Sequence, residues 1–474
     1  MKSQALLLGG VVGILIFFSF YKLTESPPLW YDEGIYTQAA MNGLGAPLLQ
    51  VAPDELVSTA SMTVGYPLLL PVGISYRLFG VGVLQGRAVM ALFLLALGLS
   101  AYLLLHKLYG ARTALFALLL LASFPMLYGN GKTVIGEIPG LFFLLACLFS
   151  LSCLEHTHYR DWRWYVTTGL TAGLAAAAKP VFILFLAALG LTYALRSRRV
   201  SLSPRGVCVG VVALALPLLL WGYLQFGGGV SARSVLSMYA NPSGVGQVLT
   251  LVQQNAMRFV SEITPIYTAV LMLLWGAALY LRGRAGTSSA ELAAFLFCVL
   301  VILAYLRIEG WYRHLFPATL VALLFLPPSC ATLFERFCRM LPRAASAAWL
   351  PSAFILALAG GELHQTARSS FVADYYNSTR TSESVAALEA IPHDSSVFLY
   401  NAPVAAALLP SKNYYQYLSL SSQASVGEEQ LPLLLRGVPD VVIVGSDFYQ
   451  KDAAFFTHYK VERTVNQYHL LTKK

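Results

Sequence analysis

Residues 5–21 read ALLLGGVVGILIFFSFY, and residues 29–37 read LWYDEGIYT. The first stretch fits a membrane-spanning helix, since a hydrocarbon core of about 30 Å needs roughly 20 apolar residues. The second stretch sets two adjacent carboxylates, Asp32 and Glu33, between aromatic residues, which favour the membrane interface. Together the two stretches predict a membrane protein with charged side chains at the mouth of its first span.

Apolar segments recur along most of the chain. Of its 474 residues, 57% are hydrophobic and 12% are charged, whereas soluble domains carry about 25% charged residues. The net charge of +9 does not indicate a nucleic-acid partner, because Lys and Arg form no single basic face or tail. We expect about eleven spans, at residues 5–21, 87–106, 113–128, 135–154, 164–178, 180–195, 206–225, 264–281, 290–306, 312–328 and 346–362.

The loops between these spans predict the orientation in the membrane. Arg-rich loops such as HKLYGAR, EHTHYRDWRW and RSRRVSLSPR alternate with loops that carry fewer cations, and the positive-inside rule places the Arg-rich loops in the cytoplasm. The N-terminus is then cytoplasmic, and the first span is expected to stay as an uncleaved anchor. Residues 22–86, 226–263, 307–311 and the tail after about residue 365 fall outside the cytoplasmic membrane.

We expect a membrane domain over residues 1–365 and a small soluble α/β domain over residues 366–474. In the tail, SESVAALEAI has helical spacing, and SSVFLY and PDVVIVGS are typical of strands. The long first outer loop, residues 22–86, contains EGIYTQAAMNGLG and PLLLPVGISYRLFG. Both stretches suit helices that lie in the plane of the interface.

Asp32 has two possible roles on sequence grounds. It can begin and cap the helix EGIYTQAA, where its charge would compensate the helix dipole. It can also be part of a reactive site with Glu33.

Further charged residues on the same side favour a reactive site. GEIPGLFF places Glu137 at the outer start of the fourth span, Lys132 lies just before it, and Lys179 stands at the turn before Pro180. A carboxylate in a span is usually functional or paired. A single Lys at the interface, in contrast, often has no functional role and places its amino group in water. The segment RIEGWYRHLFP adds Arg313 and His314, together with Arg307 and Glu309.

Carboxylates and cations thus meet on the side where few cations are expected. A phosphate-bearing lipid substrate accounts for both, because cations bind phosphate and a carboxylate can accept a proton from an acceptor hydroxyl. A lipid phosphate that leaves as an anion needs charge stabilisation more than a proton.

These motifs resemble the GT-C membrane glycosyltransferases, in particular the bacterial relatives of protein O-mannosyltransferases and the lipid A aminoarabinose transferase. The resemblance rests on YDEGIY, YRLFGVGVLQGRAV, GEIPGLFF, GLTAGLAAAAKP and RHLFP. It covers the membrane region in the same order, and this order is more specific than any single motif. It implies a GT-C fold in a multi-pass protein of the bacterial cytoplasmic membrane, with the active site on the extracytoplasmic side.

The resemblance also implies roles for residues. Asp32 matches the catalytic base, with Glu33 beside it, and Glu137 matches a second acidic position that orients the acceptor or the base. Lys132, Lys179 and Arg313 match positions that contact the donor phosphate. Arg87, which matches an arginine at the start of the second span, and His314, which stands where Tyr is frequent, are also expected to bind this phosphate.

The donor implied by the resemblance is a polyprenyl-phosphate sugar, transferred with inversion to an extracytoplasmic glycolipid, polysaccharide or protein. A divalent metal is possible, although no residue cluster has convincing ligand spacing. Two other classes of protein remain open. A transporter or a flippase for lipid-linked sugars would also use charge in the membrane, but more often shows repeated halves with broken helices. A scaffold that has lost its activity is the other alternative.

Overall fold

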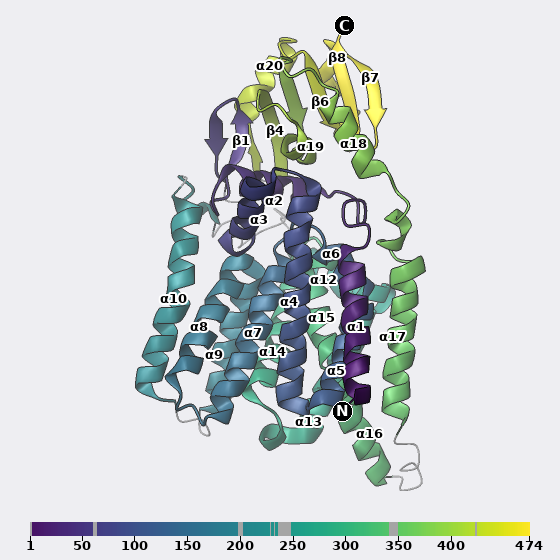
Figure 1. Cartoon of the computed structure of the whole chain (residues 1–474). Helices are drawn as coiled ribbons and strands as arrows, with labels where there is room; N and C mark the ends of the chain where they lie inside the picture. The colour runs from purple at the N-terminus through teal and green to yellow at the C-terminus, as the bar shows by residue number, and fades with distance from the viewer. Residues whose placement is uncertain are drawn as a thin grey trace.

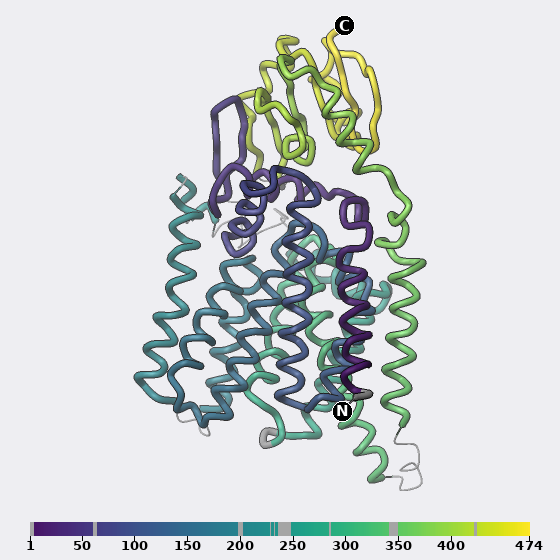
Figure 2. Tube along the Cα trace, in the orientation of Figure 1, coloured from purple at the N-terminus to yellow at the C-terminus, as the bar shows by residue number. Residues whose placement is uncertain are grey.

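A computed structural model describes residues 2–59, 64–197, 202–227, 229–231, 233–235, 248–340, 349–421 and 424–474. A long helical bundle carries a β-sheet domain at one end, and the N-terminus lies at the other end (Figures 1 and 2). The structure confirms the predicted fold class, an α-helical membrane protein with a small C-terminal α/β domain. The predicted boundary at residue 365 falls inside the last bundle helix, which continues to Arg368.

Each predicted span coincides with a helix or with a pair of helices. The bundle helices are α1 (Lys2–Phe20), α4 (Val83–Tyr109), α5 (Ala111–Ser123), α6 (Pro125–Gly131), α7 (Glu137–His156), α8 (Trp162–Ala178), α9 (Ile183–Arg196), α10 (Pro204–Phe226), α13 (Ile263–Gly286), α14 (Ser289–Tyr305), α15 (Phe316–Leu324), α16 (Leu326–Met340) and α17 (Leu350–Arg368). Residues 346–348 of the last predicted span lie outside the described residues.

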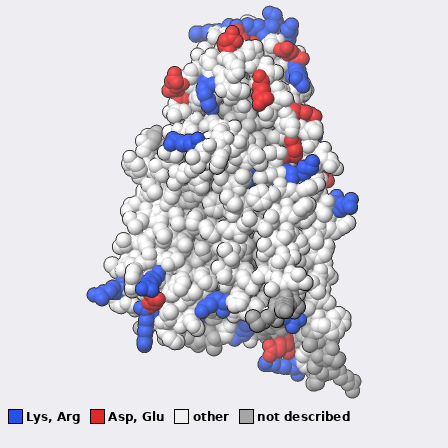
Figure 3. Space-filling view, viewed as in Figure 1, with Lys and Arg blue, Asp and Glu red and all other residues white. Residues whose placement is uncertain are grey.

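The number of spans stays a prediction. Among the described residues, four helices are long and apolar enough to cross a membrane, or up to six if each bent pair counts as one span. The bent pairs are α5 with α6, at 62°, and α15 with α16, at 50°. On the face drawn in Figure 3, charged residues gather on the sheet domain and at the opposite end of the bundle, with an almost uncharged belt between them. This distribution fits a multi-pass membrane protein.

Small residues let two of the helices pack closely. A Cβ atom added to Gly169 of α8 would lie 2.1 Å from the carbonyl oxygen of Gly210 in α10, and one added to Gly173 would lie 2.6 Å from that of Leu214. The sequence GLTAGLAAAA therefore allows backbone contact between helices, as is common in membrane bundles.

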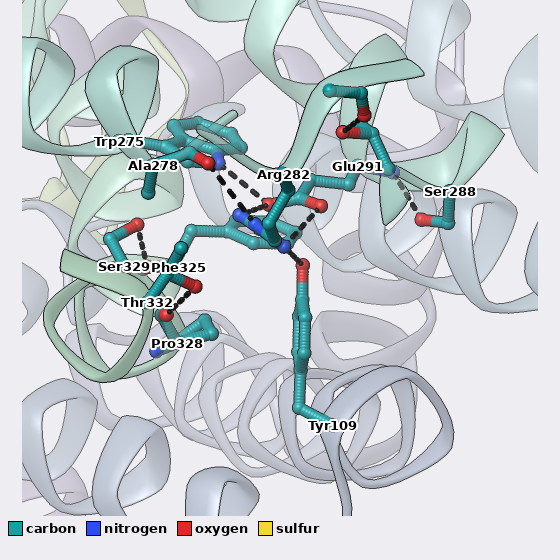
Figure 4. Close-up of polar contacts among 12 residues, drawn as sticks. Tyr109, Trp275, Ala278, Arg282, Ser288, Glu291, Phe325, Pro328, Ser329 and Thr332 are labelled. Atoms are coloured by element: carbon teal, nitrogen blue, oxygen red, sulfur yellow. Dashed lines mark hydrogen bonds and ion pairs between the residues drawn. The ribbon is translucent and has the colours of Figure 1, made fainter. Parts of the chain in front are cut away.

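A buried ion pair, drawn in Figure 4, ties several helices of the bundle together. Arg282 of α13 donates two hydrogen bonds to Glu291 of α14, with N–O distances of 2.6 and 2.9 Å. It also donates to the hydroxyl of Tyr109 at 2.8 Å, and Trp275 donates to Glu291 at 3.0 Å. The ring of Trp275 stacks on Phe325, at the junction of α15 and α16, with centroids 4.4 Å apart. The cluster thus joins four helical segments and was not predicted from the sequence.

The C-terminal domain is built on a six-stranded sheet with the strand order β5-β4-β3-β6-β8-β7. Strands β3 and β4 are parallel, as are β3 and β6, and the remaining pairs are antiparallel. The strands are β3 (Val397–Tyr400), β4 (Tyr414–Ser421), β5 (Ala424–Val426), β6 (Val441–Gly445), β7 (Tyr459–Val465) and β8 (Tyr468–Lys473). Helices α18 (Arg380–Glu389) and α19 (Pro403–Leu408) cover one face of the sheet, and α20 (Leu431–Leu435) covers the other. The helix and the two strands expected in the tail are all present.

The segment predicted to form the first outer loop joins the bundle to the sheet domain. It forms α2 (Tyr31–Asn42), the hairpin β1 (Leu49–Ala52) with β2 (Glu55–Val57), and α3 (Tyr66–Phe79). Both expected helices are present, whereas the hairpin was not predicted. Helix α2 packs on α19, and a Cβ atom added to Gly34 would lie 2.4 Å from the backbone nitrogen of Val404. Gln38 extends this contact by donating to the carbonyl of Pro403 at 2.9 Å.

Candidate active site

Asp32 lies in the first turn of α2, at the junction of the bundle and the sheet domain. The residue in the cap position is Trp30, and it provides no side-chain cap. Of the two roles left open for Asp32, capping is therefore contradicted, although its charge still lies at the favourable end of the helix dipole. The Asp32 carboxylate forms an ion pair with Arg313, and the two side chains are 22% and 26% exposed. This pair is accessible to a substrate.

Arg313 lies on the connection between α14 and α15, in a short 3-10 helix over Tyr312–His314. A further helix, α12 (Val248–Ser261), holds this connection in place. The buried side chain of Asn255 donates to the carbonyl of Ile308 at 2.7 Å, and Arg258 donates to that of Gly310 at 2.5 Å. This support was not predicted from the sequence. The amphipathic pattern of VLTLVQQNAMRFVS indicates a surface helix, but not which carbonyl groups it contacts.

Glu137 and Lys179 form a second ion pair beside the first. Glu137 is the first residue of α7, as predicted, and Lys179 follows the last residue of α8. Lys179 is directed to Glu137 rather than outward to water. The other carboxylate oxygen of Glu137, Oε2, is buried and has no hydrogen-bond partner among the described residues. A buried acceptor of this kind is costly unless something binds it.

His314 connects the two pairs electrostatically. Burial, followed by the positive charges of Arg313 and Lys179, lowers the pKa of His314 to about 3. The imidazole is therefore neutral near pH 7, so the positive charge of the site comes from Arg313 and Lys179. The structure thus brings together five of the predicted residues: Asp32, Glu137, Lys179, Arg313 and His314.

Glu33 and Arg87 have a different environment. Both are buried, and Arg87 donates two hydrogen bonds to Glu33 at 2.7 and 2.8 Å. The Nη1 group of Arg87 donates to backbone carbonyls, including those of Leu23 at 3.0 Å and Pro27 at 2.8 Å. This pair fixes the segment between α1 and α2, and thereby the position of the neighbouring Asp32.

Lys132 is also buried. Its amino group donates to the carbonyl of Tyr21 at 2.7 Å and lies 5.8 Å from the ring centroid of Tyr376. Burial, with a smaller contribution from the charge of Arg87, lowers the pKa of Lys132 to about 7. Lys132 therefore contacts the protein itself and does not carry a full charge at neutral pH.

An apolar cavity of about 340 Å³ opens beside the Asp32–Arg313 pair. Trp30 and Trp311 contact each other at its wall, with ring centroids 6.4 Å apart, and Arg313 contributes the only charged group of the lining residues described. Proline and apolar residues from the segment before α2, from α6 and from the segment after α17 complete the wall. The cavity can take an apolar chain with an anionic end at Arg313. The part of the chain that the structure describes contains no group of three or more His, Cys, Asp or Glu residues placed to hold a metal ion.

The bundle, the segment that follows α1 and the sheet domain together form the GT-C fold of membrane glycosyltransferases. Residues 69–221 match the family described as dolichyl-phosphate-mannose-protein mannosyltransferase. The resemblance to the GT-C superfamily inferred from the sequence motifs is confirmed by this match and by the fold. No protein of curated function matches the sequence.

Solved structures support the same fold. The chain is similar to apo ArnT from Cupriavidus metallidurans, with a TM-score of 0.66 and 16% sequence identity, covering 99% of this chain and 98% of that one. The same enzyme bound to undecaprenyl phosphate gives a TM-score of 0.60 at 16% identity, with the same coverage. An Archaeoglobus fulgidus oligosaccharyltransferase tethered to an acceptor peptide gives 0.54 at 14% identity, covering 96% of this chain and 70% of that one.

Proposed function

We propose that the protein is an integral membrane glycosyltransferase that moves a sugar from a polyprenyl phosphate to an extracytoplasmic acceptor. The observation that carries this proposal is the accessible Asp32–Arg313 pair at the mouth of an apolar cavity, with the Glu137–Lys179 pair beside it. Two carboxylates and two cations next to an apolar cavity suit a reaction in which a lipid phosphate leaves. The fold, and the ArnT structure that contains undecaprenyl phosphate, support this donor class.

In the proposed step, the oxygen of an acceptor hydroxyl attacks the anomeric carbon of the donor sugar. Asp32 takes the hydroxyl proton as general base. The bond between the anomeric carbon and the phosphate oxygen breaks, and its electron pair leaves with the polyprenyl phosphate. Because the attack is opposite to the leaving group, the configuration inverts.

Arg313 and Lys179 stabilise the charge that develops on the phosphate. The donor phosphate competes with Asp32 for the guanidinium of Arg313, which frees the carboxylate to accept a proton. The neutral imidazole of His314 can donate one hydrogen bond to the phosphate, and the free Oε2 atom of Glu137 can accept one from the acceptor. Glu33 and Arg87 act in this proposal by positioning Asp32, and Lys132 by supporting the end of α1.

A transporter or flippase is less well supported, because the GT-C fold and the partial family match both favour a transferase. A panel of radiolabelled polyprenyl-phosphate sugars, added to membranes that contain the protein, tests the proposal. We expect label from one sugar in an extracytoplasmic acceptor, and none in membranes without the protein. Movement of the lipid-linked sugar across vesicles with no covalent transfer would instead establish a flippase.

The predicted sidedness can be tested by cysteine labelling. In a variant without its six native cysteines, we expect Glu55→Cys, on the exposed strand β2, to react with an impermeant maleimide added outside intact cells. Arg205→Cys, exposed at the start of α10, should react only after the cells are opened. The reverse pattern would place the active site in the cytoplasm.

A further inference from the structure

The sheet domain contains a second, polar cavity of about 310 Å³. It lies where β3 and β6, two neighbouring parallel strands, reach their carboxyl ends. The connection that leaves β3 leads to α19 on one face of the sheet, and the connection that leaves β6 packs Phe448, Tyr449 and Phe456 against the other face. Connections that leave toward opposite faces open a crevice at the carboxyl ends of such strands, and ligands commonly bind there.

The floor of this cavity contains polar groups that the fold does not use. The hydroxyl of Ser446 is buried and has no hydrogen-bond partner among the described residues. Asn401 is buried and has φ of 50°, a left-handed conformation that Asn adopts more readily than most residues but that still costs energy. Its Oδ1 atom accepts hydrogen bonds from the backbone of Ser419 at 2.7 Å and from the hydroxyl of Tyr31 at 3.2 Å. No described residue binds the Nδ2 atom of Asn401.

The side chains at the rim and in the walls of the cavity indicate which class of ligand it can bind. Exposed side chains of Asp447, Asn466 and Gln467 line the rim, and aromatic rings of Phe448 and Tyr468 form part of the wall. No Lys or Arg is among the described residues that line the cavity. Amide, hydroxyl and carboxylate groups beside aromatic rings match an uncharged ligand rich in hydroxyl groups, whereas a phosphate would need cations.

Tyr31 connects this cavity to the active site. Its side chain reaches the cavity from α2, and the next residue along the chain is Asp32. We propose that the cavity is the acceptor subsite and binds an uncharged saccharide portion of the acceptor. This inference rests on the proposed function, because it names the acceptor class of that same transferase. The saccharide would be held by the sheet domain while its reactive hydroxyl faces Asp32.

Saturation-transfer NMR on the full-length protein in detergent tests the inference, with a panel of neutral mono- and oligosaccharides as probes. We expect at least one saccharide to bind the unmodified protein. Ser446→Ala with Gln467→Ala should abolish the signal, while Lys460→Ala with Glu462→Ala, on the exposed face of β7, should leave it unchanged. If the first pair does not fold, Asp447→Trp narrows the exposed rim and should give the same loss.

The Asp32→Asn variant separates this inference from the proposed function, because it should bind the saccharide as well as the unmodified protein does. Saccharide binding without any sugar transfer would leave the subsite in place and overturn the transferase. Three outcomes would overturn the subsite: no saccharide binds, the binding survives Ser446→Ala with Gln467→Ala, or only an acceptor peptide binds. In transfer assays, the same pair of changes should raise the KM for the acceptor at least tenfold with little change in the KM for the donor.

Discussion

Asp32→Asn is expected to reduce sugar transfer by about 10²- to 10⁴-fold, the range for loss of a general base. Asparagine has the shape of aspartate and can still accept a hydrogen bond from Arg313, so the protein should reach the membrane in normal amounts. The measurement is the rate of transfer in membranes supplied with the lipid-linked sugar, corrected for the amount of protein.

Glu55→Gln provides the matched control for this loss. Glu55 is an exposed carboxylate on the hairpin that follows α2 and belongs to none of the ion pairs described above, so its replacement should leave transfer unchanged. Wild-type activity in Asp32→Asn would show that Asp32 is not the base. The unpaired carboxylate oxygen of Glu137 would then be the next candidate.

Glu33→Gln is expected to destabilise the protein by about 3–5 kcal/mol, because it leaves the buried charge of Arg87 without its partner. The loss should appear as a lower melting temperature of the detergent-solubilised protein. Replacing both partners, as in Glu33→Leu with Arg87→Met, should cost less than the single change, since no unpaired charge then remains.

The exposed pair Arg339–Glu335 is the control for this prediction. Both side chains are 66% exposed, and exposed pairs contribute about 0–1 kcal/mol, so Arg339→Met should hardly change the melting temperature. A Glu33→Gln variant with normal stability but no transfer would contradict the positioning role. It would indicate instead that Glu33 takes part in the reaction.

The sequence predicted the features that depend on local pattern. The apolar runs indicated the helices, and Gly136 followed by Glu137 and Pro139 indicated the start of α7. Order along the chain was also informative, because five short motifs in sequence pointed to the GT-C fold. Asp32, Glu137 and Arg313 were proposed as site residues in this way, since each stands at the end of a helix or in a short loop.

Long-range pairing could not be predicted in the same way. Glu33 and Arg87 are 54 residues apart, and nothing in either segment distinguishes a structural pair from two separate site residues. Lys132 is a similar case. From the sequence it was expected to be a loop residue that contacts the donor phosphate, but its amino group donates to the carbonyl of Tyr21, more than a hundred residues earlier in the chain. The cavity of the sheet domain depends on how β3, β6 and α2 assemble, which no single stretch of sequence encodes.

The close contact between Gly34 and Val404 limits how this protein could be recombined with others of the same fold. A foreign C-terminal domain would have to place a backbone segment against a glycine with no space for even a methyl group. A chimera that exchanges the C-terminal domain alone would therefore displace the helix that carries Asp32. An exchange meant to change the acceptor should transfer residues 29–42 together with the C-terminal domain. The two surfaces that meet at Gly34 and Val404 then come from the same protein.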